Sequence, residues 1–283
     1  MKVVKHSGVI VDFDESKLRK SLSKSGANAE VVNAIMRQIK QVIYDGIPTK
    51  QIYKIAFGLL KKESNSLAAQ YNLRDALLLL GPAGFYFEKY IARVFESEGY
   101  TTQTNLVLNG KCVSHEIDVM LKKDNQIAMV ECKFHGSKEV NSDVKVPMYI
   151  LSRFNDLKDR THIIYTQKDT ISNCWIVTNN HFTSDALTFG NCSGLKLLSW
   201  DYPKNDNLST KIDNRNLYPI TCLTTMSRLE KDKLLAINIL LVADLIKDAE
   251  CLDRIGLSTN RIKNVLKEAT TLCKYFQSWK SNF

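Results

Sequence analysis

The sequence predicts a multidomain protein of the α+β or α/β class, with an N-terminal β-hairpin and helical bundle, a central sheet flanked by helices, and a C-terminal helical region. Three patterns predict this class. Helical periodicity dominates residues 30–80, apolar and polar residues alternate over residues 113–135, and an apolar helical pattern returns after residue 227. The three expected domains cover residues 1–82, 83–203 and 204–283.

Composition and charge narrow the functional classes. The chain has 283 residues, 44% hydrophobic and 24% charged, as expected for a soluble globular protein of two or three domains. The net charge of +9 favours a polyanion such as nucleic acid as a partner, although a solvated basic surface would give the same balance. The seven cysteines form no CxxC pair, which argues against zinc sites and disulfides. Without a signal peptide or membrane-spanning run, we expect a cytoplasmic protein.

The N-terminal part begins with two short predicted strands around a turn at Ser7-Gly8. Asp14 or its neighbour is the expected N-cap of the helix that follows. Further helices are predicted at residues 30–44, 49–62 and 66–80. Gly81-Pro82 is expected to end the last of them.

This hairpin and helical bundle resembles the ATP-cone, the nucleotide-sensing module of ribonucleotide reductases and of their repressor. The matching residues are Val3-Val4-Lys5-His6-Ser7-Gly8, Phe13-Asp14-x-x-Lys17-Leu18, Gly46-x-x-Thr49-x-x-Ile52 and Tyr71-x-Leu73. The resemblance implies that ATP or dATP binds here as an effector. The residues expected at the nucleotide are Val3, Lys5, His6 and Lys17.

Two lysines give this expectation a physical basis, since Lys5 and Lys17 suit phosphate oxygens and the hairpin backbone can close over a base. Members of the family usually carry an arginine and then an acidic residue after the first lysine, where this chain has His6 and Ser7. The alternative is therefore a cone that has lost nucleotide binding and serves as a docking bundle.

The central part begins with a predicted amphipathic helix at residues 85–100, with Phe85, Ile91 and Phe95 on one face. Glu88 falls on the same apolar face. A carboxylate beside an apolar core is costly unless it is paired or bound to something. A functional role for Glu88 is therefore favoured over the alternative that its side chain swings out to solvent.

Residues 113–135 predict two strands joined by a short polar turn. Because side chains alternate between the faces of a strand, Glu116 and Asp118 share one face of the first strand. By the same rule Glu131 and Lys133 share one face of the second strand. Carboxylates and a lysine that converge on one point are what a hard cation and a phosphate require.

This stretch resembles the PD-(D/E)xK nuclease superfamily and, within it, the Mrr-like restriction endonucleases. The matching residues are Asp118, then Glu131-Cys132-Lys133, with Gly84-x-x-Phe87-Glu88 in the preceding helix. The resemblance implies a mixed sheet and a metal-dependent endonuclease that hydrolyses DNA. In such an enzyme Asp118 and Glu131 would hold Mg²⁺ or Mn²⁺, and Glu88 would assist directly or through water. Lys133 would act as a catalytic residue at the attacking water and the phosphate.

The rest of the central part continues the α/β pattern. Strands are expected at residues 101–108, 162–166, 174–178 and 196–200, and helices at residues 140–159 and 184–189. The first of these helices, which could begin only near Pro147, carries Lys145, Tyr149 and Arg153 on one face. The resemblance implies that Lys145 and Tyr149 contact DNA phosphates, and a solvated helix face is an equally good reading.

The C-terminal part is expected to start with a polar linker at residues 205–217, followed by a strongly apolar helix from Ser227. Residues 252–275 predict two helices joined at Ile255-Gly256-Leu257-Ser258. This looks like a helix-hairpin-helix, whose turn binds DNA phosphates through backbone amides. The motif has a second glycine where this chain has Ser258, which favours a plain helical hairpin.

The leading hypothesis is a metal-dependent DNA endonuclease whose activity or assembly responds to ATP or dATP. A nucleotide-responsive DNA-binding protein without cleavage is the second, and a structural adaptor the third. The presence of Asp118, Glu131 and Lys133 argues against the second, since a site without chemistry would be free to lose them. Because cutting both strands of DNA commonly needs two active sites, a homodimer is expected.

Overall fold

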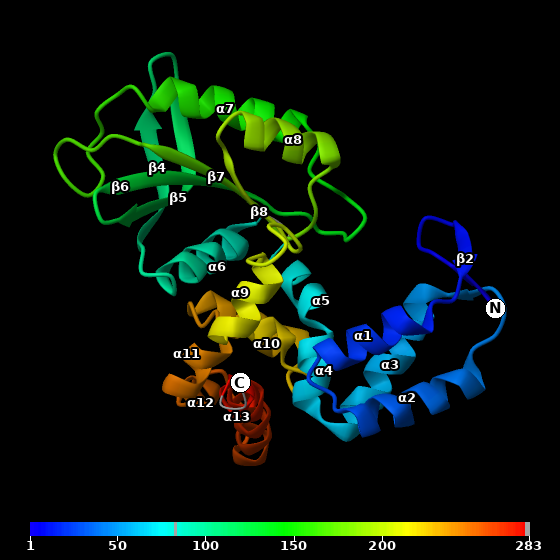
Figure 1. Cartoon of the computed structure of the whole chain (residues 1–283). Helices are drawn as coiled ribbons and strands as arrows, with labels where there is room; N and C mark the ends of the chain where they lie inside the picture. The colour runs from blue at the N-terminus through cyan, green and yellow to red at the C-terminus, as the bar shows by residue number, and fades with distance from the viewer. Residues whose placement is uncertain (82–83, 281–283) are drawn as a thin grey trace. The chain divides into compact units, whose positions relative to one another are not determined.

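The computed structural model describes residues 1–81 and 84–280, with side chains described through residue 273. The predicted stop at Pro82 and the predicted domain boundary between residues 82 and 83 lie outside these ranges. The chain forms two compact units, Met1–Ala76 with Ile220–Phe283, and Leu77–Pro219 (Figure 1). The division into three domains at residues 82 and 203 stays a prediction.

The N-terminal segment of the first unit is a small sheet followed by helices. Strands β1 (Lys2–Val4) and β2 (Ile10–Asp12) pair antiparallel, and β3 (Ile47–Pro48) pairs parallel with β1. The helices are α1 (Glu15–Lys24), α2 (Ala29–Val42), α3 (Thr49–Glu63), α4 (Asn65–Tyr71) and α5 (Leu73–Leu78). Asp14 caps α1 by accepting hydrogen bonds from the backbone of Ser16 and Lys17, as expected for an N-cap. The predicted hairpin and helical bundle are thus present.

One predicted helix of this segment is divided. The pattern over residues 66–80 predicted a single helix, whereas α4 ends at Tyr71 and α5 begins at Leu73. Asn72 lies between them, and its side-chain oxygen accepts a hydrogen bond from the Tyr53 hydroxyl at 2.9 Å. Asparagine favours such local polar contacts over helix continuation.

The C-terminal segment completes the first unit with a 3₁₀ helix, η1 (Ile220–Cys222), and four helices. These are α10 (Arg228–Ala236), α11 (Val242–Lys247), α12 (Cys251–Arg254) and α13 (Thr259–Lys280). The continuous apolar helix expected from Ser227 is wrong, because α10 ends at Ala236 and Asn238 adopts a left-handed conformation with φ +61°. The predicted turn at Gly256 is present, with φ +88°, between α12 and α13.

The second unit is built on a mixed five-stranded sheet. Its strands are β4 (Thr101–Asn109), β5 (Ser114–Lys123), β6 (Gln126–Lys133), β7 (Asn173–Thr178) and β8 (Lys196–Leu198), and they lie side by side in chain order. The pairs β4–β5 and β5–β6 are antiparallel, whereas β6–β7 and β7–β8 are parallel. The predicted mixed α/β architecture is therefore confirmed.

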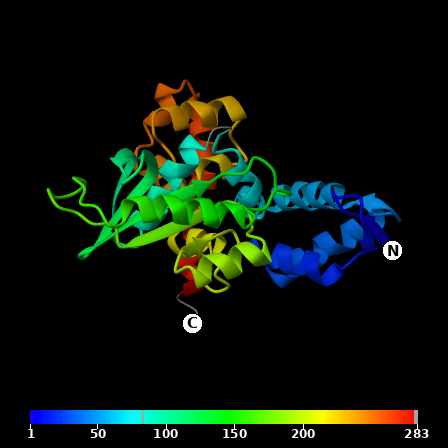
Figure 2. The same ribbon diagram turned by 90° about the horizontal axis from the view of Figure 1, so that it is seen from above.

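Helices cover both faces of this sheet. Helix α6 (Phe85–Glu96) packs against β4 and β5 on one face, and α7 (Lys145–Leu157) and α8 (Ser184–Cys192) lie against the other (Figure 1). Figure 2 shows α7 and α8 next to each other along the sheet. The core on the α7 side includes Met120, Met129, Ile150, Leu157, Ile176 and Leu197. This core holds α7 in place beside the charged residues of β5 and β6.

Two predictions for the second unit are wrong. Residues 162–166 form no strand, because the Asp169 carboxylate accepts hydrogen bonds from the backbone of Tyr165 and Thr166 and holds the segment in a turn. The expected linker at residues 205–217 contains helix α9 (Leu208–Arg215), capped by Asn207. Its polar residues include Lys211, which is buried in an ion-pair cluster.

Among residues 1–81 and 84–280, no helix combines the length and apolar composition of a membrane crossing.

Candidate functional site

The strand pair β5–β6 places two acidic residues side by side. Val119 lies opposite Val130 in the ladder, so the next position toward the end of the pair brings Asp118 beside Glu131. There the Asp118 carboxylate accepts a hydrogen bond from the backbone N–H of Cys132 at 2.7 Å. This hydrogen bond to the backbone near the end of β6 fixes the carboxyl group of Asp118 at the sheet.

Glu131 is almost fully buried and is contacted by two cations. Its side chain is 6% exposed, and Lys133 Nζ lies 2.7 Å from its Oε1. Its other oxygen, Oε2, accepts a hydrogen bond from the Arg153 guanidinium at 2.5 Å. The alternation on β6 predicted that Glu131 and Lys133 share a face, and the structure brings their side chains together.

Arg153 is a site residue that the sequence analysis missed. It lies on α7, donates a second hydrogen bond to the backbone carbonyl of Glu116, and stacks on the Tyr149 ring at 5.7 Å. Its spacing of four residues from Tyr149 placed it on the predicted basic and aromatic helix face. The sequence does not say which face of α7 meets β6, and that contact gives Arg153 its place at Glu131.

Burial and like charge change the protonation of two further acids. The pKa of Asp118 is raised from 3.8 to about 7, first by burial and then by the negative charge of Glu131, against lowering by the Cys132 hydrogen bond and by Lys133. The pKa of Glu88 is also raised, by burial and then by Glu116 and Glu131. Asp118 therefore titrates near neutral pH, and any added cation would favour its ionised form.

Helix α6 brings Glu88 to this group of acids. Gly84 precedes the helix with φ +82°, a conformation that favours glycine, and a Cβ there would lie 3.5 Å from Phe134 and 3.6 Å from Glu88 Oε1. Phe87 is fully buried, with its ring centroid 5.6 Å from that of Phe134. The turn at Gly84 and the anchor at Phe87 thus place the half-buried Glu88 near Asp118 and Glu131.

The residues fit a metal ion with few protein ligands. Within the described part of the chain, no three His, Cys, Asp or Glu side chains group as closely as a cage of protein ligands would require. Asp118 and Glu131 supply the carboxylate oxygens that Mg²⁺ prefers, and Mg²⁺ commonly binds through one or two carboxylates with waters and substrate phosphates. Both oxygens of Glu131 are engaged by Lys133 and Arg153, so a cation there would take over one of these contacts.

The predicted DNA contacts lie on the exposed side of α7. Tyr149 is 60% exposed, and Lys145 is exposed at the first residue of the helix. Tyr149 reaches the group of acids through its stack on Arg153. Within residues 1–81 and 84–273, Lys145 forms no ion pair, so its ammonium group faces solvent.

A separate cavity of 270 Å³ lies in the first unit, where the hairpin meets α1, α3 and α4. Val3, Lys5 and Lys17 line it, together with apolar side chains such as Ile52. His6 is exposed in the hairpin and is not among the described residues that line the cavity. Three of the four predicted nucleotide residues are therefore brought together and His6 is not.

Two tyrosines that the prediction did not place at the nucleotide complete this cavity. The rings of Tyr53 and Tyr71 stack with centroids 4.8 Å apart, and both line the cavity. Burial raises the pKa of both phenols, that of Tyr71 to about 12, so both stay neutral. Tyr71 was part of the motif over the first eighty residues, whereas Tyr53 had no motif signal because only the packing of α3 on α4 brings it here.

Three family profiles match the chain in order. Residues 1–75 match the ATP cone domain, residues 82–202 match the restriction endonuclease domain, and residues 218–273 match the AF1548-like C-terminal domain. The first two matches confirm the predicted domain types and their order. The third covers the C-terminal helices that the sequence analysis assigned to no family.

Two relatives are similar in sequence to this chain over 63% and 67% of its length. An uncharacterised protein of Archaeoglobus fulgidus is 34% identical over 183 residues, which are 63% of this chain and 97% of that protein. The crystal structure of AF1548, a protein of unknown function, has a TM-score of 0.55 and 31% identity over 67% of this chain and 98% of that chain. Can2 from Sulfobacillus thermosulfidooxidans, in complex with cyclic tetra-adenylate, is similar only at a TM-score of 0.33 and 14% identity, over 71% and 54% of the two chains. The chain therefore belongs to the AF1548-like family and carries an ATP-cone domain followed by a restriction-endonuclease domain.

Proposed function

We propose that this protein is a metal-dependent DNA endonuclease that hydrolyses phosphodiester bonds at Asp118, Glu131 and Lys133. One observation carries the proposal: Lys133 Nζ lies 2.7 Å from Glu131, while Asp118 on the next strand is held by the backbone of Cys132. Two carboxylates and an ammonium group thus converge at the end of one strand pair, where a divalent cation and a phosphate could both be bound. The restriction-endonuclease domain supports this class of reaction.

Each residue has a role in this proposal. Asp118 and Glu131 would hold Mg²⁺ or Mn²⁺, with Glu88 assisting directly or through a water. A divalent cation there would supply positive charge to the scissile phosphate and favour ionisation of a water molecule. Lys133 would orient or deprotonate the attacking water and neutralise the phosphate.

The exposed face of α7 and the charge of the chain support DNA as the substrate. Lys145 and Tyr149 would contact phosphates of the backbone, which fix the register of a protein on DNA without reading its sequence. The net charge of +9 favours such a polyanionic partner. A homodimer would supply the second active site that cutting both strands needs.

We further propose ATP or dATP as an effector at the 270 Å³ cavity of the cone. This volume is just below the range of about 300–1,000 Å³ that is typical of pockets for drug-sized ligands. The base and ribose would therefore lie inside, against Tyr53 and Tyr71, and the phosphates outside near Lys5 and Lys17. His6 would meet the nucleotide only if the hairpin closed. Regulation would require two states of the protein with different nucleotide affinity.

Plasmid nicking tests the nuclease proposal. Wild type should relax supercoiled plasmid with Mg²⁺ or Mn²⁺ and not with EDTA, and the rates with and without ATP or dATP are compared. Asp118→Asn and Lys133→Ala should each lower the nicking rate about a hundred- to a thousandfold, since each removes a charged group that would stabilise the transition state. Asp124→Asn, the same change in the exposed β5–β6 turn, is the matched control and should cut like wild type.

A nucleotide-responsive DNA-binding protein without cleavage is the alternative. The engagement of both Glu131 oxygens by Lys133 and Arg153 favours it, because a carboxylate already neutralised in this way has less need of a metal ion. It would be supported if wild type bound DNA but did not nick it with either metal, and if Asp118→Asn bound DNA as tightly as wild type.

A nucleotide-binding assay tests the effector proposal independently of the nuclease proposal. Labelled ATP or dATP should bind the full chain, and Lys5→Ala should weaken that binding whether or not the protein cuts DNA. Unchanged nucleotide affinity in Lys5→Ala would contradict the effector proposal alone and leave the nuclease proposal standing.

A further inference from the structure

A second, larger cavity of 730 Å³ lies in the first compact unit, separate from the cone cavity. It is formed where the end of α3 and the start of α4 meet helix α13, with Thr224 and Thr225 at its floor. Its basic and amide side chains are Lys61, Lys62, Asn65, Arg261, Asn264 and Lys267. The ATP-cone segment and the C-terminal segment thus build it jointly.

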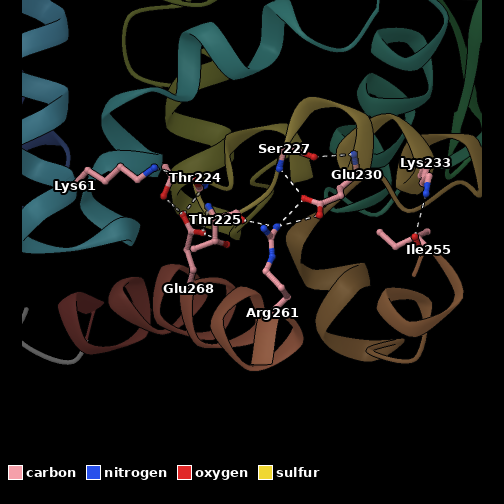
Figure 3. A network of polar contacts seen from close by, with 9 residues as sticks. All are labelled: Lys61, Thr224, Thr225, Ser227, Glu230, Lys233, Ile255, Arg261 and Glu268. Carbon is pink, nitrogen blue, oxygen red and sulfur yellow. Dashed lines mark hydrogen bonds and ion pairs between the residues drawn. The ribbon is translucent and has the colours of Figure 1, made fainter. Parts of the chain in front are cut away.

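The buried acid of this cavity is fully hydrogen-bonded by neutral donors of the cavity floor. Glu268 is 3% exposed, and its two oxygens accept hydrogen bonds from the backbone N–H and the hydroxyl of both Thr224 and Thr225, at 2.6–2.9 Å (Figure 3). Four donors fully occupy a carboxylate, so Glu268 needs no cation from the cavity wall. Glu63, the one other acid among the described lining residues, is exposed.

The cations of the wall are only partly matched. Arg261 pairs with Glu230 at 2.8 Å, and Lys61 donates to the backbone carbonyl of Thr224 at 3.1 Å (Figure 3). The side chains of Lys62 and Lys267 have no ion pair or hydrogen bond within the described part of the chain. Four cations therefore face a cavity whose buried acid is already satisfied, and two of them are uncommitted.

Helix ends alone do not explain this arrangement. Lysines in the last turn of a helix offset the negative end of its dipole, which accounts for Lys61 and Lys62 at the end of α3. Arg261 and Lys267 lie in the first half of α13, where that effect does not operate in their favour. Cations from α3 and from α13 thus converge on one cavity.

We propose that this cavity binds a small polyphosphate, such as the phosphate chain of a nucleotide. Its volume lies within the range of about 300–1,000 Å³ that is typical of small-molecule sites. Lysine ammonium groups and the amides of Asn65 and Asn264 are donors that suit phosphate oxygens. The described lining residues include no aromatic ring on which a base could stack, so the site recognises phosphate rather than the base.

The position of the site gives it a structural consequence. Lys62 belongs to the ATP-cone segment and Lys267 to the C-terminal segment, and a phosphate chain between them would join the two. A ligand that binds only the folded form raises the stability of that form by mass action. Polyphosphate should therefore raise the thermal stability of the protein independently of the cone cavity and of DNA.

Isothermal titration of the full chain with inorganic tripolyphosphate tests the proposal. The double variant Lys62→Ala/Lys267→Ala should weaken binding about tenfold or more, because each lysine contributes a charge-assisted hydrogen bond. Lys54→Ala/Lys263→Ala is the matched control, since it removes exposed lysines from the same two helices outside the cavity. The control should stay within about twofold of wild type, because exposed distant charges are screened by salt.

Two further measurements identify the ligand and control for folding. A single-stranded oligonucleotide is titrated in parallel, because its phosphates offer the same chemistry. Melting temperatures of all variants without ligand should match wild type, as the substituted lysines are exposed.

Weaker tripolyphosphate binding in Lys62→Ala/Lys267→Ala, with unchanged binding in Lys54→Ala/Lys263→Ala, supports the site. Equal weakening in both double variants, or no binding of tripolyphosphate by wild type, would each overturn it. If the oligonucleotide binds through Lys62 and Lys267 while tripolyphosphate does not bind, the surface serves a nucleic-acid backbone and the small-ligand assignment is wrong.

Discussion

The second compact unit contains two clusters of buried charge that differ in their balance. Lys211 of α9 is 4% exposed and pairs with Glu98 at 2.5 Å and Asp206 at 2.6 Å, and Arg215 lies 3.5 Å from Glu98. Two cations thus meet two carboxylates. Glu131 of β6 is 6% exposed and pairs with two cations, but further acids lie next to it.

The second cluster carries an excess of negative charge. Lys133 and Arg153 face Glu131, Asp118 and Glu88, and the pKa values of Asp118 and Glu88 are raised as a consequence of burial and of this excess. Buried charge that is unbalanced lowers the stability of a fold. The balanced cluster at Lys211 is therefore structural, whereas the unbalanced one is suited to take up a cation.

The largest effect is expected from breaking the balanced cluster. Lys211→Ala leaves the carboxylate of Glu98 buried with only Arg215 nearby, and should lower the free energy of unfolding by about 3 kcal/mol. Urea denaturation measures this loss, with Lys204→Ala, an exposed lysine close in the chain, as the control. Mg²⁺ should not restore the stability of Lys211→Ala. Recovery with Mg²⁺ would contradict the distinction between the clusters.

The pH dependence of stability is the next largest effect. Because the pKa of Asp118 is raised from 3.8 to about 7, folding takes up a proton between these values. The stability from the protonated form is complete below pH about 4 and is lost as the pH rises through 7. We compare the free energy of unfolding of Asp118→Asn with that of wild type, both without metal. The difference in favour of the variant should be about 2 kcal/mol larger at pH 8 than at pH 5. Urea unfolding at both pH values measures this, and an equal difference at both would refute it.

Removing one cation of the unbalanced cluster gives a smaller effect that metal should reverse. Arg153→Ala leaves Glu131 with Lys133 alone, and should lower the free energy of unfolding by about 1.5 kcal/mol in EDTA. Added Mg²⁺ should restore part of this loss, because a divalent cation can take the place of the guanidinium. Arg160→Ala, an exposed arginine shortly after α7, is the control and should respond to neither change. Failure of Mg²⁺ to stabilise Arg153→Ala would count against a cation site.

The smallest effect concerns the turn that delivers Glu88. Gly84 has φ +82°, so Gly84→Ala should cost about 1 kcal/mol of stability through backbone strain. Gly136→Ala is the control, because a Cβ there would meet nothing within 4 Å and its φ is not left-handed. Differential scanning calorimetry compares the two. Equal melting temperatures would mean that the α6 entry tolerates a side chain.

Local patterns predicted the central strand pair well. Side chains on a strand alternate with period two, and a turn of a few residues fixes the pairing, so residues 113–135 sufficed to expect Asp118, Glu131 and Lys133 on facing positions. The same reasoning failed for residues 205–217. Their polar composition is typical of a linker. In the structure, however, Asn207 caps helix α9, and the buried Lys211 of this helix pairs with Glu98.

Contacts between distant segments could not be predicted in this way. Arg153 was expected on a basic helix face, yet only the packing of α7 on the sheet brings it to Glu131. Tyr53 reaches the cone cavity because α3 packs on α4. Periodicity tells which residues share a face of one element and says nothing about which element covers that face.

Local periodicity and turn chemistry were enough to predict the strand pair and the helix that follows Gly84, and the resemblance of the chain's motifs to known families predicted the order of the domains. Only the packing of distant segments places Met1–Ala76 and Ile220–Phe283 in one unit and brings two cations to Glu131. Such arrangements follow from burying apolar faces and neutralising buried charge across long stretches of chain, and no local pattern records them.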